Sequence, residues 1–246
     1  MLCACLLIFI PFAHADTARI AVAANFKEIM RLLTPVFEEQ TGHQLSISYG
    51  STGKLFAQIS NGAPFDVFLA ADSHRPALAE DQKLAVPGTH FVYAGGRLVL
   101  WSPATSRFKD GEAFLLNGSF NKLAIGNPRT APYGLAAKQA LQSIGAWDRL
   151  EQKLVRGDSI AQAFQFVATG NAEIGLVAHA QVLSWKESGG SLWVVPGRYH
   201  EPINQSAVLL ERGRQNPAAL EFIEFLAGPE ARAIIRSGGY EVPEGQ

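Results

Sequence analysis

The chain has 246 residues, of which 48% are hydrophobic and 17% are charged. This composition supplies enough apolar material for one large or two small domains, and too little charge for a disordered chain. The 21 Lys and Arg residues are balanced by 22 Asp and Glu residues, which leaves a net charge of -1. Without a basic excess to neutralise phosphates, a nucleic-acid-binding protein is not expected.

The first 15 residues differ from the rest of the chain. They contain no Lys, Arg, Asp or Glu, and an apolar run over residues 6–12 leads to Ala13-His14-Ala15, an A-x-A cleavage pattern. This pattern predicts a secretory signal peptide over residues 1–15, cleaved before Asp16, although the usual basic residues at its start are missing. The alternatives are a buried N-terminal strand and a lipoprotein anchor through Cys5. The run is too short to span a membrane.

The two cysteines of the chain, Cys3 and Cys5, both lie in this segment. The exported chain would therefore have none, which excludes cysteine nucleophiles and cysteine-based zinc or iron–sulfur sites. The histidines show no H-x-x-x-H or H-E-x-x-H spacing, so neither a metal cation site nor a cofactor is expected. No later stretch approaches the length of a membrane span, which predicts a soluble mature protein.

Short apolar runs alternate with segments of helical spacing along the chain. Strands are predicted over residues 19–24, 45–49, 65–70, 91–93, 97–101, 123–126, 153–155, 173–177, 192–195 and 204–210. Helices are predicted over residues 25–40, 54–60, 133–144, 159–169, 217–227 and 229–237. The first helix has Asn25 as a candidate N-cap with Glu28 three residues later, and Pro35 should kink or split it. The alternation predicts an α/β fold with mostly parallel sheets flanked by helices.

These elements form two α/β units of ordinary domain size. The first unit is short unless the C-terminal helices return to it. We therefore predict a discontinuous first lobe of residues 16–98 and 204–246 and a second lobe of residues 99–203, joined by two hinge crossings. A ligand is expected in the cleft between the lobes, where the carboxyl ends of strands meet helix N-termini.

Four strand-to-helix junctions carry small or hydroxyl residues. They are Ala24-Asn25, Gly50-Ser51-Thr52-Gly53, Ala131-Pro132-Tyr133-Gly134 and Asp158-Ser159-Ile160. Each presents free backbone N–H groups at a helix N-terminus, which carries about half a positive charge. Taken alone, each junction indicates ordinary capping, and Asp158 is expected to cap the helix that begins near Ile160. Four converging termini would attract an anion without any Lys or Arg.

Several motifs follow one another in a characteristic order. They are AVAANF (residues 21–26), GSTGKL (50–55), GAPFDVFLAAD (62–72), AIGNP (124–128), PYG (132–134), Leu141 with Trp147-Asp148, GLV (175–177) and FLAGPEA (225–231). Over the whole mature chain, this set resembles the periplasmic molybdate-binding proteins of ABC transporters. The resemblance implies the two-lobed type 2 periplasmic-binding-protein fold.

The resemblance also implies the site and its partners. An oxyanion would be held by main-chain N–H groups and hydroxyls, carried here by Ala24, Asn25, Ser51, Tyr133 and Ile160. The ligand would be molybdate or tungstate, and the protein would act as a monomer in the periplasm, without catalysis. Its partners would be a membrane permease and the ATPase of an ABC importer.

The chain departs from one branch of this family. That branch has serines in the first loop, a small residue at position 133 and a tyrosine at position 178. Asn25, Tyr133 and Ala178 stand at these positions here. The chain thus resembles the other branch, in which the tyrosine belongs to a different wall, and Ala178 is not expected in the site.

Other ligands and roles stay open. Molybdate is a fully ionised dianion that needs only donors, whereas phosphate keeps a proton near neutral pH and favours a carboxylate acceptor. Sulfate is also an unprotonated dianion, so another tetrahedral oxyanion such as sulfate is the alternative ligand. An exported α/β enzyme is less favoured, because no G-x-S-x-G elbow is present. Asp66 is expected to bind neighbouring backbone, the four tryptophans to pack in the core or hinge, and Arg129 to be either a solvated loop charge or a long-range attractor of anions.

Overall fold

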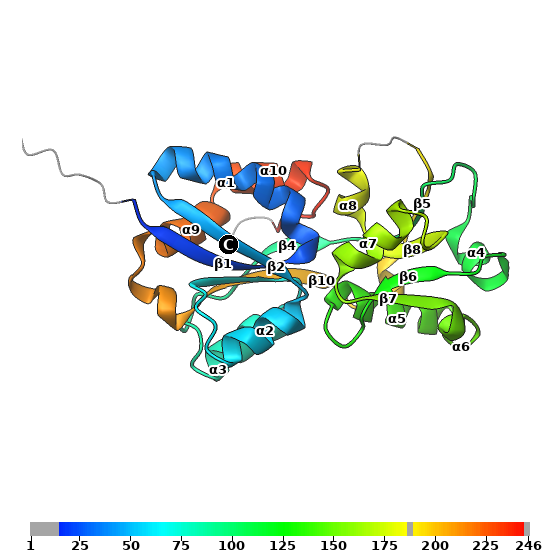
Figure 1. Ribbon diagram of the computed structural model, residues 1–246, viewed down its shortest axis with the longest axis horizontal. Helices are drawn as coiled ribbons and strands as arrows, with labels where there is room; N and C mark the ends of the chain where they lie inside the picture. The colour runs from blue at the N-terminus through cyan, green and yellow to red at the C-terminus, as the bar shows by residue number, and fades with distance from the viewer. Residues whose placement is uncertain (1–14, 186–188, 244–246) are drawn as a thin grey trace, which may run out of the picture.

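The computed structural model describes residues 15–185 and 189–243. Two β-sheets lie side by side, each between helices (Figure 1). The first has the strand order β2-β1-β3-β10-β4. Its strands are β1 (Thr17–Ala23), β2 (Gln44–Gly50), β3 (Val67–Ala70), β4 (Phe91–Gly96) and β10 (Ile203–Leu209). Strands β1, β2 and β3 are parallel, and β10 is antiparallel to both of its neighbours.

The second sheet has the strand order β7-β6-β8-β5-β9. Its strands are β5 (Leu98–Ser102), β6 (Leu123–Gly126), β7 (Leu154–Gly157), β8 (Ile174–Ala178) and β9 (Ser191–Val194). Strands β6, β7 and β8 are parallel, while β5 is antiparallel to β8 and β9. Both sheets are therefore mixed. In each, the first three strands in the order are parallel, and the fourth (β10 or β5) is antiparallel to both of its neighbours.

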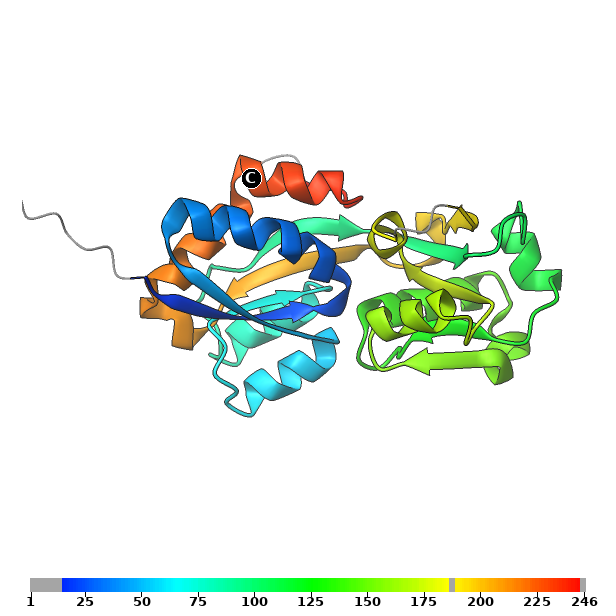
Figure 2. The ribbon, with the colours of Figure 1, turned by 45° about the horizontal axis from the view of Figure 1, so that its top comes forward.

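The chain passes between the sheets twice. It leaves the first sheet after Gly96, at the end of β4, and enters the second with Leu98. It returns after β9 and re-enters the first sheet at Ile203 of β10. Ile203 pairs with Gly96, so the two crossing segments lie side by side. Figure 2 shows the antiparallel strands β4 and β10 extending side by side between the first sheet and the second.

Helices cover both faces of the first sheet. One face carries α1 (Lys27–Thr41), α9 (Pro217–Ala227) and α10 (Pro229–Ser237), and the other carries α2 (Thr52–Ser60) and α3 (His74–Asp81) (Figure 1). The first face buries aromatic rings, with Phe37 and Phe222 packed edge to face at 5.4 Å. Burial of each such ring contributes about 1.5–3 kcal/mol, and the pair geometry adds about 0.5–1.5 kcal/mol.

The second sheet packs against a separate core. Its helices are α4 (Gly111–Asn117), α5 (Pro132–Ser143), α6 (Trp147–Leu150), α7 (Ile160–Ala168) and α8 (His179–Leu183). Trp101 of β5 is buried and stacks on Phe164 of α7 at 5.0 Å, with Trp185 edge-on at 6.3 Å. Trp147 and Trp193 pack against the same core. The prediction that the tryptophans are packing residues is thus confirmed.

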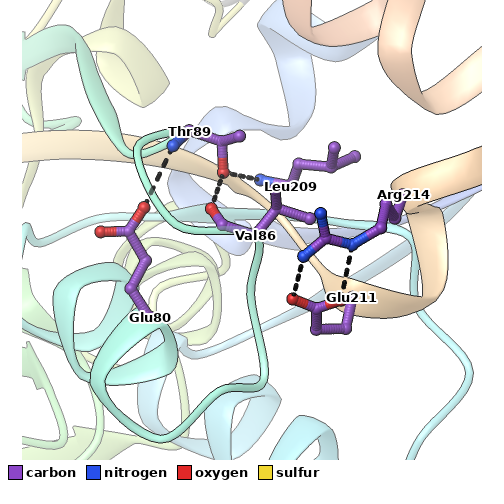
Figure 3. Close-up of polar contacts among 6 residues, drawn as sticks. All are labelled: Glu80, Val86, Thr89, Leu209, Glu211 and Arg214. Atoms are coloured by element: carbon purple, nitrogen blue, oxygen red, sulfur yellow. Dashed lines mark hydrogen bonds and ion pairs between the residues drawn. The ribbon is translucent and has the colours of Figure 1, made fainter.

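The connection from α3 to β4 is held by side chains. Thr89 Oγ1 donates to the Val86 carbonyl oxygen at 2.7 Å and accepts from Leu209 N–H of β10 at 3.2 Å (Figure 3). Glu80 Oε1 accepts from Thr89 N–H at 3.1 Å. Nearby, Arg214 and Glu211 pair within one turn at 2.7 Å and 2.9 Å. The loop is thereby fixed to the strand that crosses between the sheets.

The predicted strands are all present, and the helix predictions need two corrections. Helix α1 continues through Pro35 as one helix, so the proline does not split it, and the predicted kink stays a prediction. Proline has no N–H to donate to the carbonyl group four residues before it. Because Pro35 is exposed, water can donate to that carbonyl instead. Asn25 does not cap α1, because it lies in a 3-10 turn, η1 (Ala24–Phe26), and its amide binds elsewhere. Glu28 pairs with Arg31 instead.

Short helical elements escaped the sequence analysis. They are α3, α4, α6, α8 and the 3-10 turns η1, η2 (Glu151–Lys153), η3 (Gly197–Tyr199) and η4 (Glu211–Gln215). Each is too short to show a helical period in its apolar residues. No helix among residues 15–185 and 189–243 has the length and hydropathy that a membrane span requires. The predicted signal peptide, apart from Ala15, lies outside the described residues.

Candidate anion-binding site

The four predicted junctions meet at one small cavity between the two sheets, with a volume of about 10 Å³. The structure brings all five predicted site residues to this cavity: Ala24, Asn25, Ser51, Tyr133 and Ile160. The remaining lining residues are Ala23, Gly50, Thr52, Ala71, Ala131 and Pro132. None of the lining residues is charged. Ala178, which was not expected in the site, does not line the cavity.

Ser51 is the N-cap residue of α2, yet its side chain makes no capping hydrogen bond. The residue is only 4% exposed, and its Oγ has no hydrogen-bond partner among the described residues. A buried polar atom without a partner costs roughly 1–3 kcal/mol, so native structures rarely leave one. This hydroxyl lines the cavity, where an anion would supply the missing acceptor.

Backbone N–H groups face the same space. Tyr133 and Ile160 lie in the first turns of α5 and α7, where N–H groups have no acceptor within the helix. In the described part of the chain, neither N–H has another backbone acceptor. A Cβ atom on Gly134 would clash with the Gly126 carbonyl oxygen, so glycine allows the first turn of α5 to pack directly against the end of β6. Helix N-termini in this geometry attract negative charge.

Asn25 belongs to a buried network beneath the cavity. Its Nδ2 donates to Gln205 Oε1 at 2.6 Å and to Tyr240 Oη at 3.0 Å, and Tyr240 in turn donates to the Asn25 carbonyl oxygen at 2.9 Å. Both amide hydrogens of Asn25 are therefore used within the protein. Asn25 can offer the cavity its backbone N–H. Its predicted capping of α1 is wrong because Asn25 lies in the turn η1, and Phe26 stands at the N-cap of α1.

Tyr133 extends the network to the second sheet. Its Oη accepts from Gln205 Nε2 at 3.4 Å, and its side chain is buried. Burial raises the pKa of Tyr133 well above its ordinary value, and the hydroxyls of Tyr240 and Tyr93 raise that pKa further. Tyr133 is thus a neutral phenol with a hydrogen to donate at any physiological pH. A Cβ atom on Gly96 would collide with the Tyr133 hydroxyl, so this hinge glycine makes room for it.

Two contacts join the sheets beside the cavity. Gly53 N–H donates to the Thr130 carbonyl oxygen at 2.8 Å, and Lys54 Nζ lies 2.8 Å from Asp158 Oδ2. The second contact corrects the prediction for Asp158. The N-cap of α7 is Ser159, whose Oγ accepts from Gln162 N–H, while the exposed Asp158 carboxylate turns to Lys54. Asp158 therefore adds no negative charge to the cavity lining.

Two further predicted residues lie away from the cavity. Asp66 Oδ2 accepts from Arg19 N–H at 2.7 Å, which confirms its structural role. Arg129 is exposed in the loop before α5, and its attraction of anions stays a prediction. Within the described residues, no group of three or more His, Cys, Asp or Glu side chains is arranged to hold a metal ion.

Comparison with known proteins agrees with this architecture. Residues 18–241 match the family of bacterial extracellular solute-binding proteins. The chain belongs to this family. The molybdate-binding protein ModA of Azotobacter vinelandii is 49% identical over 93% of this chain and 91% of its own length. The ModA protein of Rhodobacter capsulatus is 47% identical over 93% of this chain and 89% of its own.

Solved structures of solute-binding proteins show the same fold. The periplasmic molybdate-binding protein of Azotobacter vinelandii superposes with a TM-score of 0.88 at 39% identity, covering 92% of this chain and all of its own. The sulfate-binding protein SubI of Mycobacterium tuberculosis has a TM-score of 0.74 at 15% identity, over 94% of this chain and 88% of its own, and it shares the fold alone. The predicted two-lobed periplasmic-binding-protein fold is confirmed, and the relatives are solute-binding proteins rather than enzymes.

The sequence analysis missed the residues behind the cavity wall. Gln205 and Tyr240 bind Asn25 from 180 and 215 residues away along the chain. Tyr93 Oη lies 3.4 Å from Gln205 Oε1. No local motif marks such distant partners. The structure buries Gln205 fully in β10, between Asn204 and Ser206, and a buried amide requires hydrogen-bond partners in the core.

Proposed function

We propose that this solute-binding protein captures molybdate in the cavity between its lobes and delivers it to an ABC importer. The observation that carries the proposal is the chemistry of the lining. The cavity offers a buried, unpartnered Ser51 hydroxyl and helix N-termini, and no charged side chain. Such a set of donors suits an anion that needs no hydrogen-bond acceptor from the protein. The relatives with 49% and 47% identity are molybdate-binding proteins.

The ligand residues in this proposal are Ala24, Asn25 and Ser51 from the first lobe and Tyr133 and Ile160 from the second. Each contributes a backbone N–H, and Ser51 adds a hydroxyl donor. A doubly charged oxyanion gains strong charge-assisted hydrogen bonds from these groups, at roughly 1.5–3 kcal/mol for each. Tungstate presents the same charge and shape and binds to the same donors.

Closure of the lobes couples binding to transport. The first lobe comprises residues 16–98 and 204–246, and the second comprises residues 99–203. The anion stabilises the closed form, because only that form brings both sets of donors to it. Gly53 and Lys54 then contact Thr130 and Asp158 across the cleft. The closed monomer docks on a membrane permease that a cytoplasmic ATPase drives.

Export precedes this function. The signal peptide over residues 1–15 directs the chain to the periplasm, and cleavage leaves Asp16 as the first residue. Mass spectrometry of the protein recovered from the periplasm tests this step. The expected mass is that of residues 16–246, and a retained or lipid-modified segment would contradict it.

Isothermal titration of residues 16–246 with molybdate, tungstate, sulfate and phosphate tests the ligand. Tight one-to-one binding of the first two anions, without heat from the others, is expected. Phosphate is expected to bind weakly because its proton finds no carboxylate acceptor in the lining. Equally tight binding of sulfate would support an oxyanion site in the cavity but contradict the assignment of molybdate as its specific ligand. The absence of binding to all four would refute the proposal.

A further inference from the structure

Helices of the first sheet bind a loop of the second sheet across the cleft. The loop comprises residues 127–131 and connects β6 to α5. Gly53, in the first turn of α2, donates its N–H to the Thr130 carbonyl oxygen at 2.8 Å. Arg75, in α3, donates from Nη2 to the Arg129 carbonyl oxygen at 3.5 Å. Two consecutive carbonyl groups of this loop are therefore bound from the opposite wall.

Gly53 fits this contact because it has no side chain. A Cβ atom at this position would lie 3.0 Å from Thr130 Cα and 3.1 Å from the Thr130 carbonyl oxygen, which is closer than side chains ordinarily pack. Both atoms belong to the backbone of the opposite wall, so the loop or a whole lobe would have to shift. The helical backbone of Gly53 does not itself require glycine, and alanine is the better helix former. The glycine therefore serves the close approach of the two walls.

Asp72 fixes the direction of the Arg75 guanidinium. Its Oδ2 accepts from Arg75 Nη1 at 2.5 Å, and its Oδ1 accepts from Arg75 N–H at 2.8 Å. The Arg75 and Asp72 side chains are 23% and 19% exposed, so water screens this pair less than an ordinary surface pair. A planar guanidinium held through one nitrogen presents the other in a defined direction. Here the second nitrogen, Nη2, meets the Arg129 carbonyl oxygen.

We propose that Gly53 and Arg75 are positioning residues that bind the loop of residues 127–131 in the closed form and so raise the affinity for the enclosed anion. The inference rests on the proposed function, because it requires an anion that closes the lobes. The loop leads directly to Ala131 and Tyr133, which line the cavity, whereas Gly53 and Arg75 do not line it. Contacts that stabilise only the closed form increase affinity through the population of that form.

Side chains of increasing size at position 53 test the close approach. Gly53→Ala should weaken molybdate binding about fivefold and Gly53→Leu about thirtyfold, because the added atoms crowd the Thr130 backbone only in the closed form. The anion-free protein can open, so the melting temperature of Gly53→Ala should equal or exceed that of wild type. Gln58→Leu, on the exposed face of the same helix, is the matched control and should change affinity less than about twofold. Wild-type affinity in both Gly53 variants would overturn the proposal.

Arg75→Lys tests the guanidinium separately from its charge. Lysine keeps the positive charge but cannot hold Asp72 and the Arg129 carbonyl oxygen with one planar group. Molybdate binding should weaken about threefold. Arg236→Lys, at an exposed arginine in the last turn of α10, is the control and should bind as wild type does. Wild-type affinity in Arg75→Lys would show that only the charge of Arg75 matters, and would overturn its part in the proposal.

Small-angle X-ray scattering distinguishes impaired closure from a lost contact with the anion. At saturating molybdate, wild type and Ser51→Ala should both show the small radius of gyration of the closed form, because Ser51→Ala lacks only a bond to the anion. Gly53→Leu should keep a larger radius at saturation, and Gly53→Ala provides the same comparison if Gly53→Leu does not fold. A fully compact Gly53 variant would overturn the proposal. A wild type that binds no oxyanion would overturn the proposed function and this inference with it.

Discussion

Ser51 and Ser159 hold the same position relative to a helix, one in each half of the molecule. Both are N-cap residues with extended backbone, at the starts of α2 and α7. Ser159 Oγ accepts from Gln162 N–H, as an N-cap serine ordinarily does. Ser51 Oγ caps nothing and is buried without a partner. The same residue type at the same kind of junction thus stabilises a helix in one place and faces a cavity in the other.

The difference between the two serines shows that a binding site can lower the stability of the anion-free protein. Because the Ser51 hydroxyl gives up its capping bond, the anion-free protein is less stable than it would be with that bond made. An anion that accepts from this hydroxyl recovers the lost free energy. A site of this kind shows itself in the structure through a polar atom that ordinary packing would have satisfied.

The largest effect is expected at Ser51. Ser51→Ala removes one charge-assisted hydrogen bond and should weaken molybdate binding by roughly 1–3 kcal/mol, or about five- to 150-fold. The free energy of unfolding of the anion-free protein should stay the same or rise, because a buried hydroxyl without a partner is lost. Titration calorimetry and denaturant unfolding measure the two quantities. Unchanged affinity would remove Ser51 from the site.

Ser159→Ala is the matched variant in the second half and should show the reverse pattern. Loss of the cap should lower the free energy of unfolding by about 0.5–2 kcal/mol. Molybdate affinity should change less than twofold, since the Ser159 side chain does not line the cavity. The same two measurements apply. A large loss of affinity without a loss of stability would show that the two serines do not differ in role.

A smaller effect is expected from the ion pair between the lobes. Lys54 and Asp158 are 50% and 70% exposed, so their pair contributes at most about 1 kcal/mol. Lys54→Met should weaken molybdate binding by less than fivefold, and this loss should shrink as salt is added. Lys122→Met, at an exposed lysine beside β6, is the control. A loss above tenfold would mean that Lys54 acts on the anion itself.

No effect on affinity is expected from pH between 7 and 9. Desolvation raises the pKa of Tyr240 to about 12 and that of Tyr133 and Tyr93 well above the ordinary value, so all three phenols keep their protons. Stability behaves differently. In the unfolded chain these tyrosines ionise near pH 10, so their contribution is complete below that pH and is lost as pH rises toward 12. Titrations at pH 7, 8 and 9 and unfolding at pH 9 to 12 check both expectations.

The sequence predicted the parts of the fold that depend on local pattern. The predicted runs 65–70 and 123–126 contain the buried strands β3 (Val67–Ala70) and β6 (Leu123–Gly126), and residues 217–227 form a helix with a proline at its first turn. The five predicted site residues meet at one cavity because each follows a strand at the edge where the two sheets face each other. Their role in binding stays a prediction.

What the sequence did not predict depends on distant partners. Asn25 has the pattern of a helix cap, but it lies in the turn η1, and its Nδ2 donates to Gln205 and Tyr240 from the far end of the chain. Asp158 has the pattern of a cap as well, but Lys54 lies within reach across the cleft. A polar side chain of this kind can bind either the local backbone or a distant residue. Tertiary contacts determine which partner it binds, and single-sequence patterns contain no information about those contacts.

The most direct measurement is the position of molybdenum in a crystal grown with molybdate. An anomalous difference map at the molybdenum absorption edge locates the metal without reference to any assumed pose. We expect one peak in the cavity, with an oxyanion oxygen within hydrogen-bond distance of Ser51 Oγ and of the Tyr133 and Ile160 N–H groups. A peak elsewhere on the molecule, or a bound oxyanion that leaves Ser51 Oγ unpaired, would contradict it.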